Sequence, residues 1–161
     1  RADVVTVAKA LGNGIPIGAV WATTEVAAAF GPGDHGSTFA GQPVAAAAAR
    51  EVLRVMEEID APRLARERGV ELTGLLEELP GISSVRGQGL LLGAELAPGV
   101  LAERTEPQVA LACLDAGLVV NGITPTALRM APPLTVSSAE LIEGTEILGE
   151  VLAAGAAGEA T

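Results

Sequence analysis

The reactive side chain that the sequence positions most clearly is Lys9, which follows the apolar, β-branched run 4–7 and precedes the glycine turn 12–14. Open α/β sheets bind ligands just outside the carboxyl ends of their strands. In apolar surroundings there, the amine should have a lowered pKa, because desolvation disfavours the charged form. Such an amine can form a Schiff base with a carbonyl compound or with pyridoxal phosphate. The alternative is a strand-end lysine that simply reaches solvent.

A second chemical signal is the glycine-dense segment 31–43, in which Ser37 and Thr38 are adjacent and Pro43 opens a helix. Backbone amides, hydroxyls and a helix N-terminus are the groups that bind a phosphate. We therefore expect a phosphate-binding region around Ser37 and Thr38.

The third signal is Arg129, which stands in the otherwise apolar run 127–134. A guanidinium in such surroundings needs a partner, because an unpaired buried charge is strongly destabilising. Its planar fork matches a carboxylate bidentately. The chemistry alone leaves two equal choices, the carboxylate of a ligand or an internal pair with a glutamate. Asn121, at the end of the run 117–121, is by itself most simply a turn-forming residue.

These motifs resemble those of the pyridoxal-phosphate-dependent class III aminotransferases of fold type I, and among them the acetylornithine aminotransferases. The resemblance rests on T-V-A-K-A-L-G-N-G at 6–14, G-D-H-G-S-T-F-A-G-Q-P at 33–43 and L-R-M-A-P-P-L at 128–134. It implies that Lys9 carries the cofactor pyridoxal 5'-phosphate and that Thr38, with Ser37, reaches the cofactor phosphate of the partner subunit in a homodimer. It also implies that Arg129 binds the substrate α-carboxylate and that Asn121 points to the acetylornithine branch.

The implied reaction is transfer of an amino group from N-acetylornithine to 2-oxoglutarate, a step of arginine biosynthesis. Another class III enzyme, acting on ornithine, succinylornithine or 4-aminobutyrate, is an alternative, as is a non-catalytic fragment. The resemblance covers almost all of this chain but only the C-terminal part of the family's chain, so we expect a fragment that is inactive alone. The missing part would supply an aspartate for the pyridine nitrogen, a stacking aromatic and a glycine-rich phosphate turn.

Composition narrows the function classes further. The 161 residues carry 20 acidic and 10 basic side chains, for a formal net charge of -10, which disfavours nucleic acid and anionic membranes as partners. No apolar stretch is long enough for a membrane span. The single cysteine, Cys113, excludes an internal disulfide and favours a cytoplasmic location, and we interpret it as a core residue. The single histidine, His35, argues against a catalytic triad or a multi-histidine metal site.

The pattern of elements predicts an α/β protein, the C-terminal part of a fold type I transferase. Residues 1–59 are expected to form the tail of the large domain with the start of an interdomain helix, and residues 60–161 a small α+β domain. A buried, parallel strand is expected at 4–7, and the longest helix at 43–59. The segment 155–161 is expected to fray. The remaining expectations are strands at 15–22, 83–86, 90–96, 118–121 and 127–131, and helices at 24–30, 61–79, 105–116 and from 137 onward with the apolar face Leu141, Thr145, Leu148 and Leu152.

Overall fold

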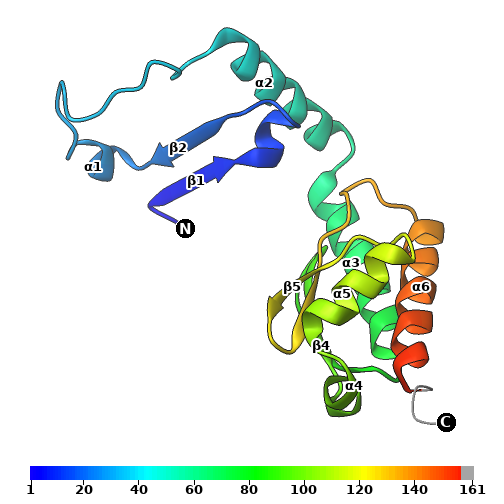
Figure 1. The fold of residues 1–161 in the computed structure, drawn as a ribbon. Helices are drawn as coiled ribbons and strands as arrows, with labels where there is room; N and C mark the ends of the chain where they lie inside the picture. Colours follow the sequence, from blue (N-terminus) through cyan, green and yellow to red (C-terminus); the bar gives the residue numbers. More distant parts are fainter. Residues whose placement is uncertain (157–161) are drawn as a thin grey trace. The chain divides into compact units, whose positions relative to one another are not determined.

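The computed structural model describes residues 1–156 and divides the chain into two compact units, Arg1–Ile59 (unit 1) and Asp60–Thr161 (unit 2) (Figure 1). The fraying expected for 155–161 falls mostly on residues outside the described range. Within that range, no helix combines the length and the apolar character needed to cross a lipid bilayer.

Unit 1 is built around a two-stranded antiparallel ribbon, in which Val4 lies opposite Ala22 and Ala8 opposite Gly18. The expected parallel pairing is wrong in the described chain. The connection 9–17 is shorter than the dozen or more residues that a parallel crossover needs, so the chain returns antiparallel. The elements of unit 1 are β1 (Val4–Ala8), the 3-10 helix η1 (Lys9–Gly12), β2 (Gly18–Ala22), α1 (Thr24–Ala27) and α2 (Pro43–Glu58).

The ribbon is also not buried, contrary to expectation. Val4 is 47% exposed and Val7 is 43% exposed, because the described residues of unit 1 do not cover both faces of the ribbon. Helix α2 contacts η1 and buries Ala45 and Ala49, which lie one above the other on one face of the helix. The small alanines thus provide most of the burial in unit 1.

Two local signals explain where the elements of unit 1 begin. The predicted strand 15–22 starts only at Gly18, because Ile15 donates its backbone N–H to Gly12 in a turn (3.1 Å) and Pro16 has no N–H for a ladder. Helix α1 has Thr23 as its N-cap, with the threonine hydroxyl accepting from the Val26 N–H at 3.5 Å.

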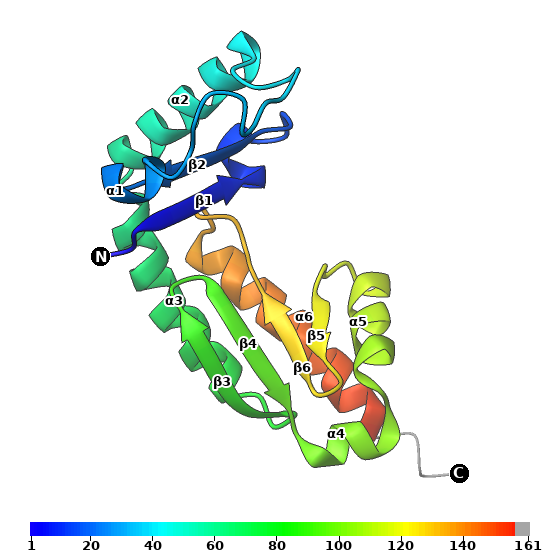
Figure 2. The ribbon, with the colours of Figure 1, turned by 90° about the vertical axis from the view of Figure 1, so that its left-hand side faces the viewer.

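Unit 2 contains a four-stranded antiparallel sheet in the order β3-β4-β6-β5 with helices α3, α5 and α6 on one face, and Figure 2 looks onto the opposite face. The longest described helix is α6, which corrects the expectation for 43–59. The elements of unit 2 are α3 (Ala61–Glu77), β3 (Ile82–Gln88), β4 (Leu91–Leu96), α4 (Pro98–Glu103), α5 (Glu106–Asp115), β5 (Asn121–Thr124), β6 (Ala127–Met130) and α6 (Ser138–Ala156).

The core of unit 2 lies between the sheet and its helices. Side chains of a strand alternate between its two faces, and alternate residues of β4 and β6 enter the core. The predicted apolar face of α6 is confirmed, since its four members are buried. Cys113 is 0% exposed within this core, so its interpretation as a core residue is also confirmed. The buried residues that β4, β6 and α6 contribute to this core include Leu92, Ala94, Leu128, Met130, Leu141, Thr145, Leu148 and Leu152.

Helix α3 approaches the β3–β4 turn so closely that only glycine fits between them. A Cβ on Gly69 would lie 2.2 Å from the carbonyl oxygen of Gly89. Gly89 has φ 57 and Gly87 has φ 142, conformations that side-chain-bearing residues rarely adopt. The turn therefore needs glycine for its backbone, and the helix needs glycine for the contact.

Helices α5 and α6 both begin with a capping pair. Gln108 accepts the Thr105 backbone N–H at 2.8 Å, and Glu140 accepts the Ser137 backbone N–H at 2.8 Å. The predicted strand 118–121 is wrong in its bounds, because Leu118 donates its N–H to Cys113 O (2.8 Å) and stays with the end of α5. Strand β5 consequently begins at Asn121.

Candidate active site

Lys9 is the first residue of η1, directly after β1, as the sequence predicts. Its backbone is left-handed, with φ 54. Among the described residues, the other non-glycine positions with positive φ are Asn13 and Asp60, types that tolerate this region, whereas lysine does not favour it. Strained backbone of this kind gathers at functional sites.

Lys9 is also the only lysine among the 161 residues, and every other basic side chain except His35 is an arginine. An arginine cannot replace a primary amine in Schiff-base chemistry, because its guanidinium stays protonated. The expected apolar surroundings of Lys9 are not found, since Lys9 is exposed at the end of the ribbon where η1 connects β1 to β2. The described chain therefore presents one accessible side-chain amine at a strained position.

Ser37 and Thr38 lie in the exposed loop between α1 and α2. The Ser37 hydroxyl accepts the Phe39 N–H at 3.2 Å, and the Ser37 carbonyl accepts the Ala40 N–H at 3.3 Å, so the segment forms a local turn. The loop enters α2 through Gln42, whose side chain does not cap the helix. Its hydroxyls and the first amides of α2 are the donors that this loop offers to an anion.

Arg129 lies on β6 and pairs in register with Asn121 on β5. The Arg129 Nε donates to the Asn121 Oδ1 at 3.2 Å. The structure thus brings together the two residues for which the sequence predicted a role with substrate. Arg129 is exposed, which corrects the expectation that its apolar neighbours bury it. Leu128 and Met130 point into the core, so strand alternation sends Arg129 to the opposite face.

The face of the sheet that carries Arg129, which we call the open face, also holds an ion pair. Arg86 Nη2 lies 2.7 Å from Glu95 Oε1, and the Thr126 hydroxyl donates to Glu95 Oε2 at 2.9 Å. Gly93 separates the two arginines, because it pairs with Arg86 on one side and with Arg129 on the other. The open face therefore has two guanidiniums and one carboxylate in neighbouring positions.

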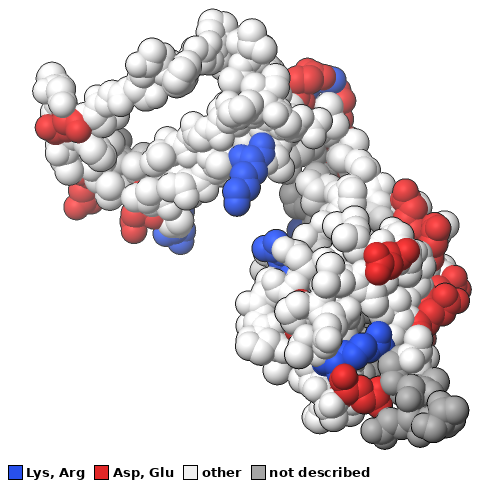
Figure 3. All heavy atoms as spheres, viewed as in Figure 1, with Lys and Arg blue, Asp and Glu red and all other residues white. Residues whose placement is uncertain are grey.

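The charge of this face contrasts with the rest of an acidic chain. Acidic side chains gather over the helical side of unit 2 in Figure 3, where α6 carries exposed glutamates at 143, 146 and 150. Arg129 has no carboxylate within salt-bridge distance among the described residues. On the open face, an anionic ligand would therefore meet a guanidinium that no described carboxylate neutralises.

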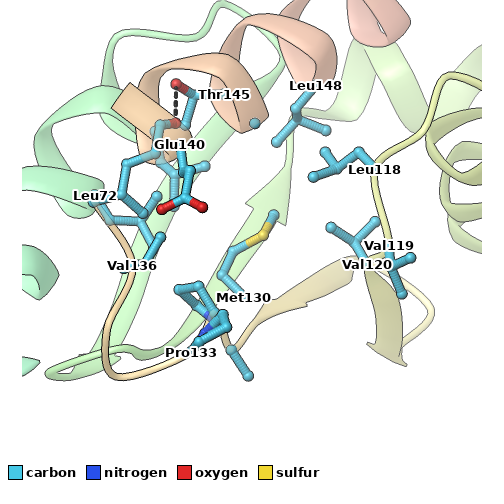
Figure 4. Close-up of a pocket in the computed structure, with 15 residues that line it drawn as sticks. Leu72, Leu118, Val119, Val120, Met130, Pro133, Val136, Glu140, Thr145 and Leu148 are labelled. Carbon is cyan, nitrogen blue, oxygen red and sulfur yellow. Dashed lines mark hydrogen bonds between the residues drawn. The ribbon is translucent and has the colours of Figure 1, made fainter. Parts of the chain in front are cut away.

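A cavity of about 400 Å³ lies on the other side of the sheet, between α3, α6 and the segments 118–120 and 130–136 (Figure 4). Its lining is mostly aliphatic. The Thr145 hydroxyl that faces it already donates to Leu141 O at 2.9 Å, and the Ser137 backbone N–H and hydroxyl hold Glu140. Met130 lines this cavity whereas Arg129 does not. The cavity thus offers no amine for carbonyl chemistry, and its one lining carboxylate is engaged in a helix cap.

The predicted residues fall into two groups, one in each unit. Lys9, Ser37 and Thr38 belong to unit 1, and Asn121 and Arg129 belong to unit 2. The contact between Asn121 and Arg129 was missed by sequence reasoning. The hairpin turn 125–126 was only a partial signal, because equal counting from it places Asn121 opposite Met130, and a register shift between Gly122 and Thr124 moves its partner to Arg129.

The family model for class III aminotransferases matches residues 1–152 of the chain. The chain belongs to the class III aminotransferase family. The acetylornithine aminotransferase of Corynebacterium efficiens is 43% identical to this family member over 151 residues, which are 94% of this chain and 36% of the relative. The chain thus spans little more than a third of that relative.

Solved structures of aminotransferases share the fold over part of their length. The N-acetylornithine aminotransferase of Stenotrophomonas maltophilia superposes with a TM-score of 0.79 at 33% identity, covering 96% of this chain and 40% of that chain. The ornithine aminotransferase of Toxoplasma gondii, described with partial occupancy of pyridoxal phosphate at its active site, gives 0.83 at 27% identity, covering 96% and 37%. The mixed helix-and-sheet fold is therefore that of class III aminotransferases over part of their length.

Proposed function

We propose that this chain is part of a pyridoxal-phosphate-dependent aminotransferase that transfers the amino group of N-acetylornithine to 2-oxoglutarate in arginine biosynthesis. The observation that carries the proposal is Lys9, the only lysine of the chain, in a left-handed conformation at the end of β1. The identity of 43% to an acetylornithine aminotransferase supports the substrate.

The residues present fit part of the cofactor. Lys9 Nζ is accessible and would hold the aldehyde carbon, and the exposed hydroxyls of Ser37 and Thr38 suit a phosphate. In the proposed homodimer this phosphate belongs to the cofactor of the partner subunit. Groups that bind the pyridine ring would come from the part of the relatives that this chain does not span.

Each residue then has a defined task. When bound, the cofactor supplies an electron sink for the substrate carbon that loses its proton. Lys9 Nζ would move that proton as a general acid and base. Arg129 would hold the α-carboxylate through its guanidinium fork, with Asn121 Oδ1 accepting from Nε. The enzyme would act in the cytoplasm on small amino acids and oxo acids.

A test of the lysine uses the complete enzyme that contains this chain, incubated with pyridoxal phosphate and then reduced with borohydride. Peptide mapping should find the label on the peptide that contains Lys9, and Lys9→Ala should lose both this label and nearly all turnover. Because the chain has no other lysine, no other side chain within it can be labelled in this way. A label retained by Lys9→Ala on another peptide would refute the assignment.

A test of the arginine uses Arg129→Lys. An ammonium cannot replace a bidentate fork, so the KM for 2-oxoglutarate should rise while the affinity for the cofactor stays unchanged. An unchanged KM would remove Arg129 from the proposed site.

A second candidate function is that of an ornithine aminotransferase, which the similarity to the Toxoplasma gondii structure favours. Turnover of ornithine in preference to N-acetylornithine by the same enzyme would select that candidate.

A further inference from the structure

Glu95 is the protein carboxylate on the open face best placed to compete for Arg129. On β4, Gly93 pairs with Arg129, and Glu95 is two positions further along the same strand. Diagonal neighbours on one face of a sheet lie within reach of each other when their side chains are long. Gly93 contributes no side chain between them. A free Glu95 carboxylate would therefore be able to turn toward the Arg129 guanidinium.

The structure instead engages both carboxylate oxygens of Glu95 elsewhere. Oε1 accepts from Arg86 Nη2 at 2.7 Å, and Oε2 accepts from the Thr126 hydroxyl at 2.9 Å. The Glu95 side chain is 23% exposed, whereas that of Arg86 is 58% exposed. The Glu95 carboxylate is thus held close to the surface of the sheet, with its oxygens directed to Arg86 on β3 and to Thr126 in the β5–β6 turn.

The other partner of Arg129 is neutral. Asn121 Oδ1 accepts from Arg129 Nε at 3.2 Å, which orients the guanidinium without neutralising it. The two terminal nitrogens, Nη1 and Nη2, have no hydrogen-bond partner among the described residues. These two nitrogens form the end of the fork that binds a carboxylate with two parallel hydrogen bonds.

We propose that Arg86 and Thr126 are positioning residues that hold Glu95 away from Arg129 and so keep the guanidinium free for a substrate carboxylate. The inference rests on the proposed function of Arg129 and goes beyond it by giving the β3–β4 ion pair a role in dicarboxylate affinity. It makes Glu95 an internal competitor whose access to Arg129 depends on Arg86.

The test is a double-mutant cycle in the cofactor-loaded complete enzyme, with binding of glutarate, an unreactive dicarboxylate, measured by calorimetry. Arg86→Gln frees Glu95, so the Kd should rise about fivefold, the size expected for competition from a partly exposed ion pair. Arg86→Gln combined with Glu95→Gln should restore the Kd to within about twofold of the wild type. Glu95→Gln alone should bind at least as tightly as the wild type.

A second variant guards against a loss of folding in Arg86→Gln. Thr126→Val removes the other hydrogen bond to Glu95, so it should weaken glutarate binding in the same direction and also be rescued by Glu95→Gln. Thermal unfolding of each variant shows whether the sheet is intact. A merely structural role of the ion pair predicts lower melting temperatures with no rescue of binding in the double variants.

Three outcomes would overturn the inference: an unchanged Kd in Arg86→Gln and in Thr126→Val, equal weakening with and without Glu95→Gln, or tighter binding in Arg86→Gln. None of these would affect the role of Arg129. Failure of that role would appear separately, as an unchanged glutarate Kd in Arg129→Lys.

Discussion

The close contact between Gly69 and the β3–β4 turn predicts a large effect for a single methyl group. In Gly69→Ala the new Cβ would stand 2.2 Å from Gly89 O and 2.5 Å from the carbonyl carbon, both backbone atoms. Helix α3 and the turn would have to separate by roughly 1 Å to restore ordinary contact. Neither partner can yield by rotating a side chain, so the strain falls on the backbone and on the core beneath it.

The magnitude follows from comparing this variant with a matched control in the same helix. Gly74 is exposed, and a Cβ there would meet nothing within 4 Å. Replacing glycine by alanine in a helix interior stabilises by about 1 kcal/mol, and both variants receive this gain. Overpacking adds a penalty of about 1–3 kcal/mol to Gly69→Ala alone. We expect Gly74→Ala to be more stable than Gly69→Ala by about 1–3 kcal/mol.

The assay is urea unfolding followed by circular dichroism, with both variants and the wild type in the same protein. A change in midpoint at constant slope reports stability, because the slope depends on the surface exposed on unfolding. Gly74→Ala should unfold at a higher urea concentration than the wild type, and Gly69→Ala at a lower one. Equal midpoints for the two alanine variants would refute the close packing of α3 against the turn.

Two further predictions concern single groups in unit 2. The backbone N–H and the hydroxyl of Ser137 lower the pKa of Glu140 from 4.5, so its stabilisation is complete above pH 4.5 and is lost as the pH falls through the folded-state pKa. Glu140→Ala should lower the melting temperature at neutral pH but not in strong acid, and a pH-independent difference would contradict this. Burial raises the pKa of the Cys113 thiol, against the opposing effect of Arg104, so a disulfide reagent should label it only as fast as unit 2 opens. Rapid labelling of the native protein would show that the thiol is not in the core.

The elements that the sequence predicted well carry their signals locally. The capping pairs Thr105–Gln108 and Ser137–Glu140 place the starts of α5 and α6, because each pair satisfies backbone groups within four residues. The apolar face of α6 follows from the period of 3.6 residues per turn. Pro43 marks the start of α2 because its missing N–H is unneeded in the first turn.

The features that were predicted incorrectly depend on contacts between distant residues. The run 4–7 has the composition of a buried strand, but its pairing and exposure depend on what packs against it. Arg129 was expected to be buried because its neighbours are apolar, whereas the pleat of β6 sends it to the opposite face. The left-handed backbone of Lys9 has no compositional signal, because lysine does not favour that conformation. The position of Lys9 directly after a strand was nonetheless predicted correctly, and its role stays a prediction.

The unequal division of buried side chains between the units has a consequence for motion. In unit 1 only Gly12, Ala45 and Ala49 are buried, whereas unit 2 packs one face of β4 and β6 into a continuous core. A two-stranded ribbon is at best marginally stable, so the amides of β1 and β2 should exchange with solvent hydrogen through frequent local opening. The amides of β4 and β6 should exchange only when the whole unit opens. In the isolated chain, Arg129 therefore lies on a strand that opens rarely, whereas Lys9 follows a strand that opens often.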